Sequence, residues 1–228
     1  EHIREMTLDI KNIINKKKIM IAENIAKILI ESDAVRLSPQ DPFAYTSGLK
    51  GPIYTDNRLL ISFVEERKKI VDAFVDLVKE RGLKPECIAG TATAGIPWAA
   101  FMAERLGLPM VYVRSKPKGH GAGKQIEGKL PEGKSVLIVE DLVTTGGSAI
   151  NSVKAIREEG KGIVHEVFAI FSYGLEKAEN AFRESSTART SLTNLDVLLD
   201  VALASGKIST DDKAKVMKFK TDPVGWMN

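Results

Sequence analysis

The chain has 228 residues, a formal net charge of +3 and 43% hydrophobic residues, which is typical of one globular domain with a full core. The charge is too small and too scattered to indicate a nucleic-acid partner, and no apolar run approaches the roughly 20 residues of a membrane helix. A single cysteine, Cys87, excludes an internal disulfide framework. With no secretion leader at the N-terminus, we expect a cytoplasmic protein with neither a nucleic-acid nor a membrane partner.

The first third of the chain predicts two helices separated by an irregular region. Apolar residues at helical spacing, among them Ile14, Ile21 and Leu29, predict a helix over residues 10–31. Residues 39–58 are rich in Gly, Pro, Tyr and Thr and predict loops and short strands. Ser62 and Glu65 have the spacing of a capping box, which predicts the start of a helix that Gly82 ends.

From there short apolar strands alternate with helices. Strands are predicted at 87–90, 110–113, 136–139 and 163–171, helices at 95–106 and 148–159, and two tail helices at 195–204 and 211–218. This alternation indicates βαβ units and a mostly parallel sheet. Ligands of such sheets bind beyond the carboxyl ends of the strands.

One segment after a predicted strand has the residues of a sugar-phosphate site. The apolar run at 136–139 leads into Glu140 and Asp141, followed by a hydroxyl- and glycine-rich turn that opens a helix, 144–148. Backbone N–H groups at a helix N-terminus bind phosphate, and carboxylates accept hydrogen bonds from sugar hydroxyls. Taken singly, the same pieces would also fit an ordinary strand, turn and capped helix.

A second segment, residues 114–126, is basic and flexible in composition. It contains four cationic side chains, one histidine, three glycines and no acid before Glu127. Such a run is often a solvated surface loop. Because it directly follows a predicted strand, we expect a loop of the site that is mobile until an anionic ligand binds.

Four segments, in this order, resemble the type I phosphoribosyltransferases and in particular the orotate phosphoribosyltransferases. They are 43–58, with Ser47-Gly48, Pro52-x-Tyr54 and Asp56-x-Arg58; 90–97; 114–124, with its arginine, lysines and His-Gly pair; and 136–148. The resemblance covers roughly residues 20–180. It implies an α/β fold with a mostly parallel central sheet flanked by helices, a small N-terminal hood at about 36–60 and a mobile catalytic loop. We expect one domain over residues 1–228, with a C-terminal helical extension at about 190–228.

The same resemblance implies an activity. A pentosyltransferase of this kind transfers the ribose 5-phosphate of 5-phosphoribosyl 1-pyrophosphate to orotate, giving orotidine 5′-phosphate and pyrophosphate in pyrimidine biosynthesis. Two alternatives are a transferase for another nucleobase and a non-catalytic regulator that senses phosphoribosyl pyrophosphate. The hood segment argues against the first, and the basic loop against the second.

Roles for individual residues also follow from the resemblance. The expected catalytic residues are Arg114, Lys116, Lys118, His120 and Asp141. Phosphoribosyl pyrophosphate would be bound by Glu140, Asp141, Thr144, Thr145, Gly146, Gly147, Ser148, Thr91 and Thr93. Orotate would be bound by Ser47, Gly48, Lys50, Tyr54, Arg58 and Thr145.

The implied cofactor is Mg²⁺, held mainly by substrate phosphates and also by Asp141, with no dedicated protein metal site. A homodimer with shared active sites is implied as well. Three positions where many relatives have lysine are Thr46, Ala94 and Ser115. After the last core strand, where relatives often have an arginine that contacts orotate, this chain reads Phe171-Ser172-Tyr173-Gly174. Arg58 and Lys50 are the expected replacements that hold the orotate carboxylate.

Overall fold

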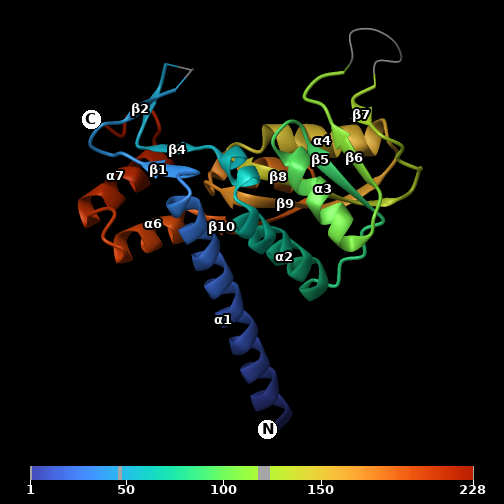
Figure 1. Ribbon diagram of the computed structural model, residues 1–228, viewed down its shortest axis with the longest axis horizontal. Coiled ribbons are helices and arrows are strands. Elements are labelled where there is room, and N and C mark those ends of the chain that lie inside the picture. Colours follow the sequence, from blue (N-terminus) through green and yellow to red (C-terminus); the bar gives the residue numbers. More distant parts are fainter. Residues whose placement is uncertain (1, 46–47, 118–123, 228) are drawn as a thin grey trace.

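A six-stranded sheet forms the centre of the protein (Figure 1), with the order β10-β9-β8-β5-β6-β7. This computed structural model describes residues 2–45, 48–117 and 124–227, and the side chains from residue 12 onward except residue 14. The strands are β5 (Cys87–Thr91), β6 (Met110–Val113), β7 (Ile126–Glu127), β8 (Ser135–Val143), β9 (Ile163–Ser172) and β10 (Ala188–Asn194). All neighbours are parallel except β6 and β7. The predicted mostly parallel α/β fold is confirmed.

Alternate residues of the central strands enter two separate cores, because successive side chains of a strand point to opposite faces. Ile88, Leu137 and Phe168 belong to one core, which α1 (His2–Glu31), α2 (Val64–Glu80), α3 (Gly95–Leu106), α6 (Leu195–Ala204) and α7 (Thr210–Thr221) cover. Cys87 and Ile138 belong to the other, under α4 (Gly147–Glu158) and α5 (Glu176–Glu184). The sheet is therefore buried on both faces, which explains its nearly continuous apolar strands.

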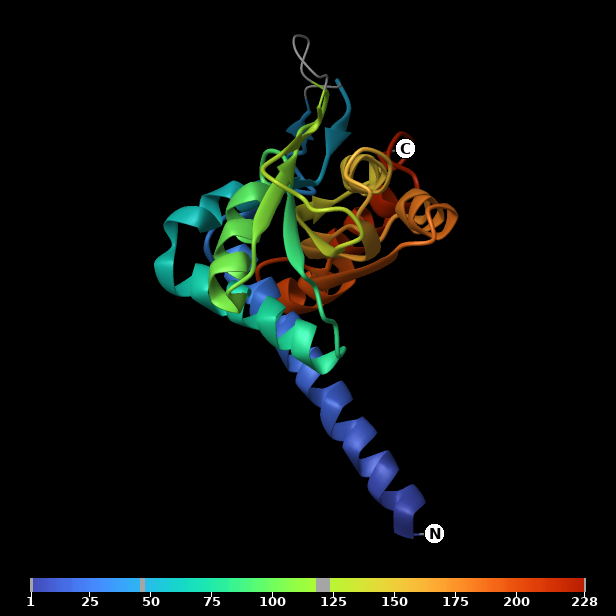
Figure 2. The same cartoon turned by 90° about the vertical axis from the view of Figure 1, so that its right-hand side faces the viewer.

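Short strands form a separate layer at one side of the sheet. β1 (Val35–Leu37) pairs with β4 (Ile53–Thr55), and β2 (Phe43–Ala44) pairs with β3 (Lys50–Gly51), both antiparallel. A 3₁₀ helix, η1 (Asn57–Ser62), then leads into α2. These strands and the β6–β7 end of the sheet rise on opposite sides of the carboxyl edge, while α1 projects away from the body in both ribbon views (Figures 1 and 2).

Several sequence predictions need correction. The capping box of Ser62 and Glu65 is wrong: η1 extends to Ser62, α2 begins at Val64, and its N-cap residue Phe63 makes no side-chain hydrogen bond. α5 and β10 were not predicted, because β10 is mostly polar and α5 buries only Ala178 and Phe182. β8 runs four residues beyond its predicted end, so both acids lie inside the strand.

Among the described residues, no helix is both long and apolar enough to cross a membrane.

Candidate active site

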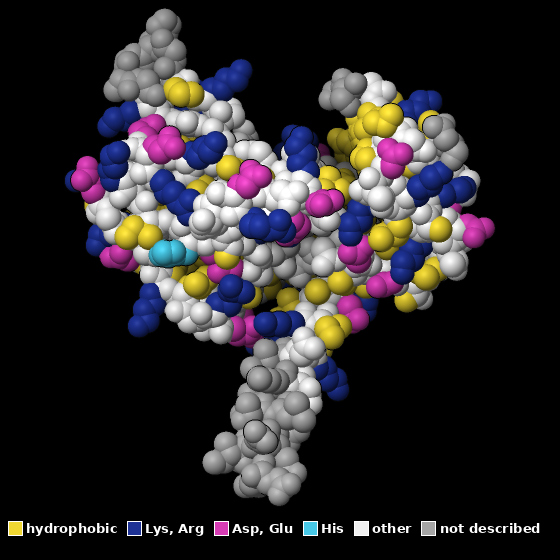
Figure 3. Space-filling model, turned by 180° about the vertical axis from the view of Figure 1, so that it is seen from behind, with side chains coloured by type: hydrophobic (Ala, Val, Ile, Leu, Met, Phe, Trp, Pro, Cys, Tyr) yellow, Lys and Arg dark blue, Asp and Glu magenta, His cyan; other side chains and the backbone are white. Residues whose placement is uncertain are grey.

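The two acids lie where β8 loses one of its neighbours. β5 pairs with β8 only as far as Val139, whereas β9 continues alongside to Val143. α3 starts in the gap beyond β5, and a Cβ at Gly95 would lie 2.4 Å from the carbonyl oxygen of Val139. Only glycine allows α3 to begin this close to β8. The end of β8 thus lies at the carboxyl edge of the sheet, where the upper surface of the protein is hollowed into a cleft between its two lobes (Figure 3).

Glu140 is a buried carboxylate, with 4% of its surface exposed. Its Oε2 accepts a hydrogen bond from Ser148 Oγ at 3.0 Å, and its Oε1 accepts one from the N–H of Asp141 at 3.2 Å. Burial, and then repulsion by the adjacent Asp141, raise the pKa of Glu140 well above its ordinary value. Its ionisation therefore costs free energy that a ligand donating hydrogen bonds would recover.

Asp141 lies beside two residues of the segment that links the hood strands to α2. Its carbonyl oxygen accepts a hydrogen bond from Asn57 Nδ2 at 2.8 Å. Burial raises the pKa of Asp141, although hydrogen bonds to its carboxylate and the positive charge of Arg58 oppose the shift. Arg58 is itself paired with Asp56 at 2.6 Å and is exposed. The predicted ribose-binding acid and the predicted orotate-binding arginine are thus brought together.

The turn after β8 presents the N-terminus of α4 to the cleft. Gly146 is the N-cap residue, with φ +81°, and it supplies no capping side chain. The first N–H groups of a helix lack partners within the helix, and here they form a site suited to phosphate. Thr144, Thr145, Gly147 and Ser148 are all exposed around this turn. The residues predicted to bind the phosphate thus lie together at this turn, where Ser148 also donates a hydrogen bond to Glu140.

Two predicted site residues lie at the end of β5, Thr91 as its last residue and Thr93 just after it. Thr91 is buried, and its hydroxyl lies 3.0 Å from that of Ser152 on α4, so it links β5 to the phosphate-side helix. Thr93 is exposed, and its carbonyl accepts a hydrogen bond from the N–H of Ile96 at 3.2 Å. Thr93 has the exposure that ligand contact needs, whereas Thr91 has a structural hydrogen bond.

The described part of the basic loop begins close to α4. The carbonyl of Ser115 accepts a hydrogen bond from Asn151 Nδ2 at 3.5 Å, and Arg114 is held by Gln125 and, at 3.4 Å, by Glu127. Lys116 is exposed. Two of the predicted loop residues, Lys118 and His120, lie outside the described residues, as does Ser47 of the hood.

A mostly apolar hollow of about 310 Å³ borders the acid turn. It is lined by side chains of the hood, the end of β9 and α7: Tyr45, Ile53, Tyr54, Thr55, Thr144, Tyr173, Leu175, Phe219 and Pro223. Tyr173 Oη and Thr55 Oγ1 lie 3.0 Å apart and join the hood to the sheet. The hollow has the size and lining of a site for a planar ring.

Only some of the residues predicted for orotate are found at this hollow. Tyr54 lines it, with the Arg36 guanidinium 5.0 Å from its ring centre. Gly48 has φ +83°, which a glycine adopts readily at this turn. Lys50 is exposed on β3, where its carbonyl accepts a hydrogen bond from Trp226. Asn57, Tyr45, Thr55 and Tyr173 could not be predicted from the sequence, because each is placed here by a contact with a residue distant along the chain.

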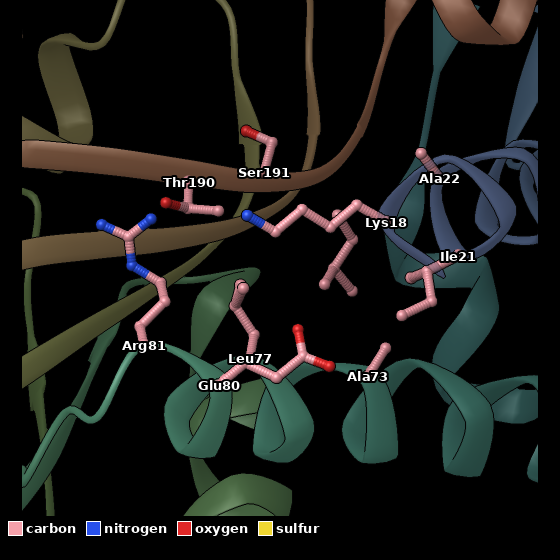
Figure 4. Close-up of a pocket in the computed structure, with 10 residues that line it drawn as sticks. Lys18, Ile21, Ala22, Ala73, Leu77, Glu80, Arg81, Thr190 and Ser191 are labelled. Carbon is pink, nitrogen blue, oxygen red and sulfur yellow. The ribbon is translucent and has the colours of Figure 1, made fainter. Parts of the chain in front are cut away.

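A different hollow, of about 210 Å³, lies between α1, α2 and β10, and Figure 4 shows Lys18, Arg81 and Glu80 around it. Arg81 follows the end of α2, before β5 begins, so this hollow is remote from the carboxyl edge of the sheet.

Figure 3 shows acidic and basic side chains intermixed over the rear face, with the upper surface hollowed between two lobes. The described residues contain no group of three or more His, Cys, Asp or Glu that could hold a metal by themselves.

Comparison with known proteins agrees with this geometry. The phosphoribosyl transferase domain family matches residues 64–195. An orotate phosphoribosyltransferase of Oceanobacillus iheyensis is 48% identical over 198 residues, covering 87% of this chain and 98% of the relative. That of Bacillus subtilis is 47% identical over 204 residues, covering 90% and 94%.

Solved structures show the same fold. The orotate phosphoribosyltransferase of Aeropyrum pernix has a TM-score of 0.69 at 29% identity, covering 81% of this chain and 99% of that one. The UMP synthase of Leishmania donovani has a TM-score of 0.73 at 24% identity, covering 87% and 42%. With close relatives matched over nearly their whole length, this chain belongs to the orotate phosphoribosyltransferases of the type I phosphoribosyltransferase family.

Proposed function

We propose that the protein transfers the ribose 5-phosphate of 5-phosphoribosyl 1-pyrophosphate to orotate, forming orotidine 5′-phosphate and pyrophosphate in pyrimidine biosynthesis. The observation that carries this proposal is the pair formed by the buried Glu140 and the half-buried Asp141, beside the uncapped N-terminus of α4. A ribose 5-phosphate site needs two parts. Carboxylates accept hydrogen bonds from the neighbouring ribose hydroxyls, and the N–H groups at a helix N-terminus donate hydrogen bonds to the phosphate.

Each part of the cleft has a proposed role. Glu140 and Asp141 accept hydrogen bonds from the ribose hydroxyls, and the turn comprising Thr144, Thr145, Gly146, Gly147 and Ser148 binds the 5-phosphate. Thr91 and Thr93 belong to the loop on the pyrophosphate side. Arg114, Lys116, Lys118 and His120 neutralise the pyrophosphate as it leaves, which is effective when the closed site excludes water.

Orotate would bind between the hood and the acid turn. We propose Ser47, Gly48, Lys50, Tyr54, Arg58 and Thr145 as its contacts, and the Tyr45–Tyr173 hollow as the space for its ring. The ring N1 of orotate is already nucleophilic, so the protein must align it behind C1 of the ribose and needs no strong base. Arg58, exposed and near Asp141, has the charge to hold the orotate carboxylate.

Mg²⁺ fits the donors that are present. Asp141 and Glu140 offer carboxylate oxygens beside the phosphate turn, which suits an ion held mainly by substrate phosphates. When bound, Mg²⁺ would neutralise pyrophosphate charge, and Asp141 is the residue that would reach it. We further propose a cytoplasmic homodimer in which the loop of one subunit closes over the other's site, and a single domain whose hood spans about 36–60 and whose helical extension spans about 190–228.

The test is a spectrophotometric assay. Loss of orotate absorbance should require both phosphoribosyl pyrophosphate and Mg²⁺, and chelation of the ion should stop it. Uracil, adenine and hypoxanthine, offered separately, should give no pyrophosphate. Pyrophosphate release with one of these bases and none with orotate would overturn the substrate assignment. Binding of phosphoribosyl pyrophosphate without any transfer would point to the sensing regulator instead.

A further inference from the structure

Asn57 is a buried polar residue at the junction of hood and sheet, with 1% of its surface exposed. It opens η1, directly between the ion-paired Asp56 and Arg58. Its Nδ2 donates a 2.8 Å hydrogen bond to the carbonyl oxygen of Asp141. Because β5 stops pairing with β8 at Val139, this carbonyl lies beyond the β5–β8 ladder, and a side chain from the hood provides its donor.

The bonded carbonyl belongs to Asp141 itself, so the hydrogen bond acts on the main chain of the residue whose carboxylate faces the site. A peptide unit is planar, so holding its oxygen limits rotation of the whole unit that follows the Asp141 Cα. The direction of a short side chain follows the backbone that carries it. Asn57 therefore acts on the orientation of the carboxylate through the Asp141 backbone.

The other half of the Asn57 amide is unused. Its Oδ1 is buried and has no hydrogen-bond partner within the described part of the chain. Exchanging the two amide positions would place oxygen against the carbonyl oxygen of Asp141, so the hydrogen-bond network requires the present orientation. Buried polar atoms are almost always paired, and an unpaired one lowers stability, so the amide is retained at a cost to folding. The one hydrogen bond that this side chain makes is the one that its Nδ2 donates to Asp141, among the described residues.

We propose that Asn57 is a positioning residue, which aligns Asp141 for the ribose hydroxyls and links that alignment to the hood. The inference rests on the proposed role of Asp141. Since Asn57 precedes Arg58, a proposed orotate contact, movement of the hood on orotate binding would be passed through η1 to the ribose side of the site. Orotate and phosphoribosyl pyrophosphate would then influence each other's binding.

The experiment compares Asn57→Leu with wild type, because leucine has a similar size, lacks the donor and removes the unpaired oxygen. We expect kcat/KM for phosphoribosyl pyrophosphate to fall roughly 10- to 100-fold, as misplacement of a reacting group does. The melting temperature should stay within a few degrees, and KM for orotate should change much less. Asn57→Ala provides a second variant should leucine prevent folding.

A matched control is Asn194→Leu. Asn194 also makes one side-chain hydrogen bond to backbone, accepting from the N–H of Val197 at 3.0 Å, but it lies on β10, which β9 separates from β8. Loss of that cap should lower the melting temperature and leave kcat/KM nearly unchanged. An equal loss of kcat/KM in this variant would overturn the proposal, because it would show a general response to destabilisation.

A double-mutant cycle with Asp141→Asn completes the test. If Asn57 acts through Asp141, Asn57→Leu should cost no more than about twofold in the Asp141→Asn background, since effects along one chain of contacts are not additive. Full activity of Asn57→Leu, or a full additional loss in that background, would overturn the positioning role. Full activity of Asp141→Asn by itself would instead contradict the proposed role of Asp141.

Discussion

Replacing Glu140 by glutamine should stabilise the protein while it impairs the enzyme. An ionised carboxylate with 4% exposure carries a desolvation cost of several kcal/mol. Two hydrogen bonds, from Ser148 and from the N–H of Asp141, return about 1.5–3 kcal/mol each while Glu140 is charged. Glutamine avoids the desolvation cost, keeps neutral hydrogen bonds of about 0.5–1.5 kcal/mol, and relieves the repulsion with Asp141. We expect a net gain of about 1–2 kcal/mol at pH 7.5, or about 2–8 °C in melting temperature.

The stability gained by the Glu140→Gln replacement should depend on pH, and the sign of that dependence follows from the raised pKa of Glu140. Folding makes this carboxyl harder to ionise, so its cost to stability is present above the folded pKa and disappears below the ordinary value of 4.5. Thermal melts of both proteins at pH 7.5 and pH 4.5 should therefore show a gain that is large at the higher pH and nearly absent at the lower. A variant less stable than wild type at pH 7.5, or a gain independent of pH, would refute the reasoning.

Three further predictions concern catalysis. Asp141→Asn should leave the fold intact and lower kcat/KM for phosphoribosyl pyrophosphate, with a loss of transition-state stabilisation of about 2–4 kcal/mol. Steady-state kinetics and a thermal melt test this, and unchanged kinetics with a normal melting temperature would contradict it. Tryptic cleavage after Lys118, which glycine follows in the sequence, should slow when orotidine 5′-phosphate, pyrophosphate and Mg²⁺ are bound, and equal rates with and without them would contradict closure of the loop. Mixing a chain that carries Lys116→Ala and Lys118→Ala with an Asp141→Asn chain should, after subunit exchange, restore about a quarter of wild-type activity. Half of the dimers are then mixed, and one of the two composite sites in each mixed dimer is undamaged. An inactive mixture after proven exchange would show that each chain uses its own loop.

The parts of the fold that could be predicted were those with a strong apolar period. α3, α6 and β6 have the bounds expected from sequence, since their buried residues recur at the spacing of a helix or a strand. α5 and β10 lack that pattern, and their places depend on packing against β9 and α4. Ser62 illustrates a local signal that a competing structure overrides, because η1 already uses the residue.

The candidate site divides in the same way. Residues consecutive in sequence, such as the acids and the turn at 144–148, could be found because one strand, turn and helix position them all. Asn57 and Tyr173 could not, since their partners Asp141 and Thr55 lie 84 and 118 residues away along the chain. The residues next to Asn57 in the sequence do not distinguish it from an exposed asparagine that precedes an arginine.

The location of Cys87 makes the protein convenient for spectroscopy. Its thiol is 1% exposed in the second core, and burial raises its pKa, so little reactive thiolate forms near neutral pH. As no other cysteine exists in the chain, a cysteine introduced at the exposed Ser115 would be the one that a maleimide dye modifies rapidly. A fluorophore could then follow the basic loop during turnover without any prior removal of native thiols.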